Sequence, residues 1–159
     1  MAETKTLVAY YSRTGATRTL AQAVAMELEA ELEEIRDRKK RTGPWLPLAG
    51  LDAVLRRETQ IEAPRREPAD YDLVVVGTPV WAWSMAAPVR TYLRRNRGAL
   101  PRVAFFAVAR AAGAGCACSA MEKETGRIAT ATLAVRRADV LGDRCAGAVR
   151  WFADRIRAG

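Results

Sequence analysis

Five short apolar segments alternate with helix-like segments along this chain of 159 residues, and no other feature restricts the fold as strongly. The clearest segment is 72–78, DLVVVGT, in which four consecutive apolar residues are typical of a strand buried on both faces. Regular alternation predicts an α/β fold with an open parallel sheet, helices on both faces and binding at the carboxyl ends of the strands. The expected strands are 5–11, 32–35, 72–78, 102–108 and 131–135, and the expected helices are 16–30, 88–97, 117–125 and a last one carrying Cys145, Val149, Phe152 and Ile156.

Two parts of the chain give a weaker pattern. Segment 32–35 lies in the run ELEEI, which lacks alternation, so by propensity the first helix would also be able to continue through it. Residues 37–71 are charged and rich in proline, but Leu48, Leu51 and Leu55 share a helical face, so we expect a long connection with one short helix. The length suits one independent core, so residues 1–159 are expected to form a single domain.

The composition indicates a soluble globular chain, because half of the residues are hydrophobic and 28% are charged. No run approaches the ~20 apolar residues that a membrane span needs, and the first ten residues lead directly into a strand. We therefore expect no membrane contact and no secretory signal. The three cysteines, Cys116, Cys118 and Cys145, make no even set, which favours a reducing cytoplasm.

Arginine supplies 22 of the 26 basic residues and most of the formal net charge of +8. Such an excess is compatible with an acidic partner, an anionic substrate or a nucleic acid. The basic residues are spread along helix-like faces with few aromatics among them, which argues against nucleic acid. A bias in the composition of the genome would explain the same excess without any partner.

A polar turn follows the first expected strand and leads into the first expected helix. Three hydroxyls, a glycine and the unpaired amides of a helix N-terminus make an anion pocket there that suits a phosphate monoester. The spacing matches neither G-x-x-x-x-G-K-[ST] nor G-x-G-x-x-G, which disfavours triphosphate and dinucleotide sites. The alternative is that a hydroxyl of this turn only caps the helix. The turn reads Ser12-Arg13-Thr14-Gly15-Ala16-Thr17.

The motif S-x-T-G-x-T, after a first strand that ends in Tyr-Tyr, resembles the FMN-phosphate loop of the flavodoxin family. The resemblance runs from Thr6 to about Arg157 and implies a flavodoxin-like three-layer sandwich with a five-stranded parallel sheet in the order 2-1-3-4-5. It also implies FMN as the cofactor, with this loop on the ribityl phosphate. The implied ligands are Ser12, Thr14, Gly15 and Thr17, together with the amides of Arg13 and Ala16.

A second loop follows the clearest strand and contains two tryptophans. Tryptophans at the carboxyl end of a central strand are costly to leave in water and suit packing on a flat heterocycle. The alternative is that they fold back on the core or on a second copy of the chain. The stretch resembles the second flavin loop of the family, which implies that Trp81 is the better stacking partner and that Tyr11 belongs to the core. The implied ring-binding residues are Pro79, Val80, Trp81, Ala82 and Trp83.

A third loop, after the fourth expected strand, provides Ala109, Arg110 and Gly113 as further candidates. Its small residues would let the backbone approach a ring closely. Flavodoxins often place an aromatic or acidic residue here, and this loop has neither. A cation such as Arg110 near the pyrimidine end of the flavin would favour the reduced anion and raise the midpoint potential.

The chain contains no histidine, so Cys116 and Cys118 complete no ordinary zinc site unless Cys145 and a carboxylate converge on them. We interpret both as packing residues and predict no metal. We also predict no catalytic acid or base, because a flavin carries out the electron chemistry itself.

Two functions are compatible with these motifs: an electron carrier, or an NAD(P)H-dependent reductase of quinone-like acceptors. The corresponding partners are a redox protein, or NAD(P)H with a small acceptor, and a homodimer is left open. A phospho-acceptor receiver domain is disfavoured, because it needs an acidic cluster where this chain has Ser12-Arg13. The remaining alternative is a flavodoxin-fold binding module that has lost FMN, since the third loop departs from the family pattern.

Overall fold

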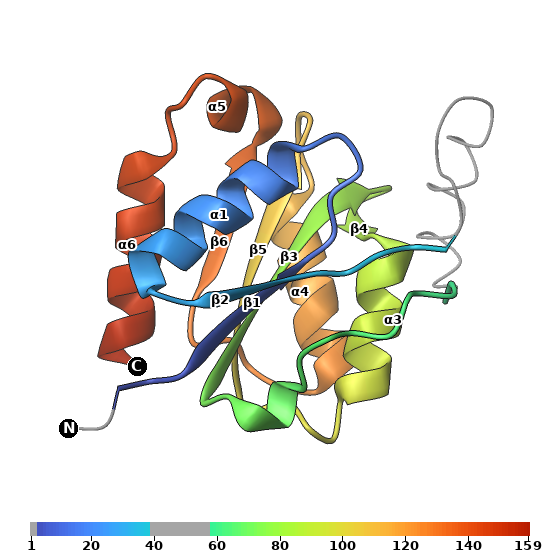
Figure 1. Ribbon diagram of the computed structural model, residues 1–159. Coiled ribbons are helices and arrows are strands. Elements are labelled where there is room, and N and C mark those ends of the chain that lie inside the picture. The colour runs from blue at the N-terminus through green and yellow to red at the C-terminus, as the bar shows by residue number, and fades with distance from the viewer. Residues whose placement is uncertain (1–2, 39–57) are drawn as a thin grey trace.

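The computed structural model describes residues 3–38 and 58–159 (Figure 1). Strands and helices alternate through most of this part, as expected. The strands are β1 (Thr6–Tyr10), β2 (Glu31–Glu34), β3 (Leu73–Trp81), β4 (Ser84–Met85), β5 (Arg102–Ala109) and β6 (Thr132–Arg136). The helices are α1 (Ala16–Leu28), the 3₁₀ turn η2 (Pro68–Asp70), α3 (Ala87–Asn96), α4 (Ala114–Thr125), α5 (Arg137–Leu141) and α6 (Ala146–Ala158).

The sheet has the order β2-β1-β3-β5-β6, and all four of these pairings are parallel. Counted along the chain, these five strands have the predicted order 2-1-3-4-5. The α/β class and the sandwich are therefore confirmed. One strand was not predicted: β4 pairs with the end of β3 in the antiparallel sense and makes a sixth strand beside this path.

Helices cover both faces of the sheet and form the outer layers of the sandwich (Figure 1). Helices α1 and α6 cover one face, and α3 and α4 cover the other. The middle strands pack against both helical layers. Phe105 of β5 packs in the cluster with Tyr92, and Phe106 packs in the cluster with Phe152. Both phenylalanines are fully buried. This two-sided burial explains why the central strands are apolar runs without alternation.

Gly77 in the middle of β3 makes room for one of these rings. A Cβ atom at this position would lie 2.0 Å from the ring of Phe106. Because Phe106 is fully buried in the cluster with Phe152, a side chain at position 77 would displace its ring from that packing.

Strand β2 (Glu31–Glu34) resolves the ambiguity in segment 32–35. The first helix ends at Leu28, because Glu29 takes a left-handed conformation at φ 51°, and a strand follows rather than more helix. The missing alternation has a local cause: Glu33 is buried on this edge strand, where its carboxylate accepts a hydrogen bond from the Arg65 amide and pairs with Arg66. The short helix expected around Leu48, Leu51 and Leu55 lies outside the described residues.

Several boundaries differ from the predicted ones. Strand β3 continues to Trp81 instead of ending at Thr78, so the second expected loop is largely a hairpin. Helix α4 begins at Ala114, three residues before the expected start, because Gly113 takes a left-handed conformation as its N-cap. Helix α5 was not predicted. Within the described ranges, none of the helices is long and apolar enough to cross a membrane.

Candidate functional site

A pocket of about 220 Å³ lies where the carboxyl ends of β1, β3, β5 and β6 meet. This is the edge at which open parallel sheets bind ligands, because the loops leave neighbouring strands in different directions there. Four segments far apart in the sequence contribute to its wall. The lining residues are Arg13, Thr14, Ala16, Thr17, Pro79, Val80, Trp81, Val108, Arg110 and Arg137.

The loop between β1 and α1 forms one side of the pocket. Gly15 is the N-cap of α1 and has φ 103°, a left-handed backbone that glycine adopts without strain. The Ser12 hydroxyl oxygen accepts a hydrogen bond from the Gly15 amide at 3.1 Å, which tightens the turn. The first hydrogen bonds of the helix come from Thr19 to the Gly15 carbonyl, so the amides of the first turn point out of its N-terminus.

A strained hairpin forms the next side. Ala82 and Trp83 join β3 to β4 with φ 47° and 64°, which are the signs expected at the two central positions of a type I′ turn. Two side-chain hydrogen bonds hold the base of the hairpin. The Thr78 hydroxyl accepts from the Ala86 amide at 3.0 Å and donates to the Pro79 carbonyl at 2.8 Å.

The two tryptophans of this hairpin have different surroundings. Trp81 is only 8% exposed and meets the ring of Tyr11 edge-on, with the centroids 5.5 Å apart, while it also lines the pocket. Tyr11 belongs to the core, as predicted. Trp83 is 63% exposed and lies outside the pocket. Trp81 is therefore the aromatic side chain that a ligand in this pocket would meet.

The loop between β5 and α4 packs against the hairpin through Gly113. A Cβ atom on this residue would lie 3.1 Å from the Trp83 ring and 3.2 Å from Val80, and its φ of 96° also favours glycine. Gly113 therefore brings the second and third loops into contact. Arg110, in the same loop, is exposed at the rim of the pocket.

The pocket gathers eight of the fourteen predicted binding residues in its wall: Arg13, Thr14, Ala16, Thr17, Pro79, Val80, Trp81 and Arg110. The other six, Ser12, Gly15, Ala82, Trp83, Ala109 and Gly113, shape the loops or stand beside the wall. Two lining residues were not predicted, Val108 and Arg137. Arg137 follows a carboxyl strand end like the other three segments, but no glycine, hydroxyl or aromatic residue marks its loop in the sequence.

A family model described as Flavodoxin matches residues 5–135, which is most of the chain. The chain belongs to the flavodoxin family. The motif that carried the resemblance, the loop from Ser12 to Thr17, lies inside the matched range. The match ends just before Arg137.

Solved structures of flavodoxin-like proteins share this fold. A flavoprotein from Lactobacillus acidophilus NCFM in complex with FMN is 22% identical, with a TM-score of 0.71 over 88% of this chain and 97% of that one. The apo-form of the flavoprotein from the same organism is 24% identical, with a TM-score of 0.62 over 86% and 93%. The two-electron reduced flavodoxin of Megasphaera elsdenii is 16% identical, with a TM-score of 0.60 over 94% and 98%.

The charge of the pocket suits the phosphate group of a flavodoxin cofactor. Three lining residues are arginines, Arg13, Arg110 and Arg137, and none of the lining residues from the described part of the chain is an aspartate or glutamate. The Nε atom of Arg137 is buried, and the described residues offer it no hydrogen-bond partner. The first amides of α1 also have no partner within the helix, and a phosphate dianion supplies acceptors for donors of this kind.

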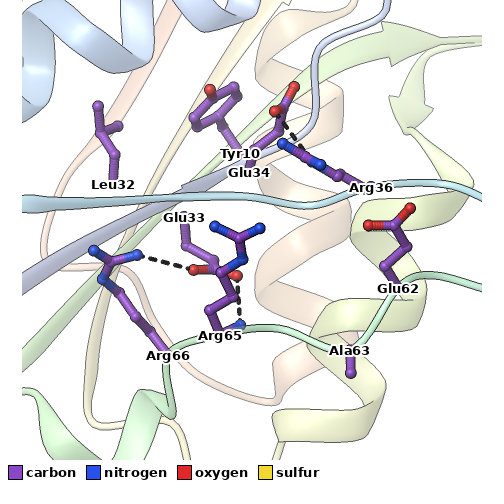
Figure 2. A pocket seen from close by; sticks show the side chains of 9 residues that line it. All are labelled: Tyr10, Leu32, Glu33, Glu34, Arg36, Glu62, Ala63, Arg65 and Arg66. Atoms are coloured by element: carbon purple, nitrogen blue, oxygen red, sulfur yellow. Dashed lines mark hydrogen bonds and ion pairs between the residues drawn. The ribbon is translucent and has the colours of Figure 1, made fainter.

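A second pocket, at the β2 edge, has a different chemistry (Figure 2). Its three carboxylates, Glu33, Glu34 and Glu62, face three arginines, so charges of both signs are present in equal number. The pairs Arg66–Glu33 and Arg36–Glu34 join the groups at 3.3 Å and 3.5 Å. We interpret the Arg66–Glu33 pair as a structural contact that holds the segment before β3 against the edge strand β2.

Arg18 and the cysteines take no part in the candidate site. The Arg18 guanidinium pairs with Glu34 and lies outside the pocket lining. Cys118 is buried as predicted, and burial raises the pKa of its thiol to about 12, whereas Cys116 is exposed and is not a packing residue. No three metal-ligating side chains come together within residues 3–38 and 58–159.

Proposed function

We propose that this chain binds FMN non-covalently and acts as a redox protein. One observation carries the proposal: the same pocket joins the phosphate-type loop at the start of α1 to the Trp81 segment of β3. Among the described residues, three arginines and no carboxylate line it. A ligand that satisfies both ends needs a phosphate and an apolar ring. The family and the FMN complex of the Lactobacillus flavoprotein support FMN as that ligand.

The residues have separate tasks in this proposal. The hydroxyls of Thr14 and Thr17 and the first amides of α1 bind the ribityl phosphate, because those amides have no partner within the helix. Pro79, Val80 and Trp81 exclude water from one side of the ring. When bound, FMN supplies the electron chemistry, while the chain binds, orients and tunes it.

The visible absorption spectrum of the purified protein tests this proposal. FMN and riboflavin are titrated separately, and we expect tight binding of FMN and weaker binding of riboflavin, which lacks the phosphate. A Thr17→Val variant should lose affinity for FMN by about tenfold, the effect of one hydrogen bond to a charged group. If neither flavin binds, the proposal is wrong, and the chain is a flavodoxin-fold binding module of another kind.

Positive charge near the hairpin supports an anionic reaction partner. A groove of about 820 Å³ lies beside the hairpin tip and is lined by Trp83, Arg97 and Lys123, among others. Clustered cations attract anions such as NAD(P)H or the acidic face of a redox protein. Steady-state oxidation of NADPH with a quinone acceptor separates the two roles: turnover indicates a reductase, and its absence with FMN bound indicates a carrier.

A further inference from the structure

Arg137 occupies a place in the pocket that the phosphate motif does not reach. It is the first residue of α5, directly after β6, and it lines the same pocket as Thr14 and Thr17. The side chain is partly buried. Residues more than a hundred positions apart in the sequence thus face one cavity of about 220 Å³.

The surroundings of Arg137 leave its buried donor without an acceptor. The nearest carboxylate along the chain is Asp139, and it is already engaged: one oxygen accepts from Arg136 and the other from Arg144, both at 3.2 Å. The Nε atom of Arg137 is buried without a hydrogen-bond partner in the described part of the chain. A buried donor of this kind costs free energy unless an acceptor completes it.

The position of α5 identifies which end of the pocket Arg137 serves. Helix α5 packs against α1, and Val140 of α5 belongs to the same apolar cluster as Ala16 and Leu20 of α1. This contact brings the start of α5 to the N-terminus of α1, where the free amides lie. Trp81 belongs to the cluster on the opposite face of the sheet.

We propose that Arg137 is a ligand of the FMN phosphate and that it sets much of the preference for FMN over riboflavin. The inference rests on the proposed function and deepens it. A guanidinium presents several N–H donors in one plane and pairs with phosphate oxygens through two of them at once. The anion therefore has contacts to α1 and to the β6–α5 junction, so that a residue outside the loop motif completes the site.

The test compares Arg137→Gln with Arg136→Gln, a neighbouring charge loss whose side chain pairs with Asp139 and lies outside the pocket lining. Dissociation constants for FMN and riboflavin are measured by quenching of flavin fluorescence. We expect Arg137→Gln to weaken FMN binding about 10- to 100-fold and to change riboflavin binding less than threefold. Arg136→Gln should change neither by more than threefold. Arg137→Lys keeps the charge without the fork and should give an intermediate FMN affinity.

The outcomes distinguish this inference from the proposed function. If Arg137→Gln weakened the binding of FMN and riboflavin equally, the guanidinium would contact the ribityl chain or the ring. If FMN binding did not change, the guanidinium would not belong to the site. Either result overturns the inference. Circular dichroism and the melting temperature show whether each variant folds. If the wild-type protein binds neither flavin, the proposed function fails, and the increase in melting temperature with inorganic phosphate then tests the anion site alone. The inference about FMN is then overturned as well. Loss of the increase in Arg137→Gln would show that Arg137 holds an anion other than FMN, and an unchanged increase would show that it holds none.

Discussion

Gly15 shows how one backbone conformation supports the whole anion site. Its φ is 103°, and no heavy atom lies within 4 Å of the position that a Cβ would take. A substitution there is therefore disfavoured by conformation and not by space. The left-handed turn aims the first amides of α1 out of the helix, where they face the pocket.

We expect Gly15→Ala to lower the free energy of unfolding by about 1–2 kcal/mol, because alanine is strained at this φ. Gly98→Ala is the matched control, since its Cβ would also meet nothing within 4 Å and its φ is not left-handed. Urea denaturation of both variants checks the prediction. Equal stability of the two variants would show that the left-handed turn stores no strain.

Arg110 tests the electrostatic contribution of a single exposed cation. With FMN bound, Arg110→Ala should lower the two-electron midpoint potential by about 20–40 mV, since removing a cation at the rim costs the reduced anion about 1–2 kcal/mol. Spectroelectrochemical titration measures the shift. Arg102→Ala, at the opposite end of β5, is the control and should leave the potential unchanged. A potential that stays constant or rises in Arg110→Ala would exclude this role.

Among the elements, the β3–β4 hairpin has the poorest match between residue type and backbone. Type I′ turns favour Asn-Gly, because both central residues have positive φ, whereas this chain has Ala82-Trp83. A backbone kept in a rarely populated region is characteristic of binding sites. The tip residues Ala82 and Trp83 line the groove at Arg97 and Lys123, whereas residues 79–81 line the pocket at the carboxyl ends of the strands.

Ala82→Asn should stabilise the protein by about 0.5–1 kcal/mol, because asparagine tolerates the left-handed conformation better than alanine. The control is Ala99→Asn, an exposed alanine without positive φ. Thermal and urea unfolding of the two variants should separate them. A loss of stability in Ala82→Asn would mean that the alanine methyl group makes a contact of its own.

Elements with a strong local pattern were predictable, and elements shaped by contacts were not. The apolar runs of β1, β3 and β5 and the proline at the start of α3 carry their own signals, so these elements and their order were found. The hairpin has no asparagine or glycine to mark its turn. Helix α5 has five residues and no side-chain cap, and its place depends on packing against α1.

The same limit applies to the candidate site. Thr14 and Thr17 belong to a compact motif and were found, because their spacing is local. Arg137 belongs to the same pocket only through the parallel pairing of β5 with β6 and the contact of α5 with α1. Sequence separation hides such a residue among 22 arginines until the fold brings it to the pocket.

For the molecule as a whole, the pocket contacts both sides of the central sheet. Its wall includes Thr17 from α1 on one side of the sheet and Trp81, which packs with the cluster on the other side. Ligand contacts at this place are lost when either layer separates from the sheet. Binding should therefore stabilise global folding and not only the loops.

We expect FMN at a hundredfold excess over its dissociation constant to add about 2.7 kcal/mol to the free energy of unfolding, because it binds only the folded chain. For a domain of this size, that gain corresponds to a rise of about 5–10 °C in the melting temperature. Riboflavin at the same concentration should give a smaller rise, since it lacks the group that the arginines and the α1 amides bind. Differential scanning calorimetry of the apo-protein with each flavin measures both. Equal rises for the two flavins would mean that binding comes from the ring alone, and the phosphate loop would then contribute nothing to the stability of the whole molecule.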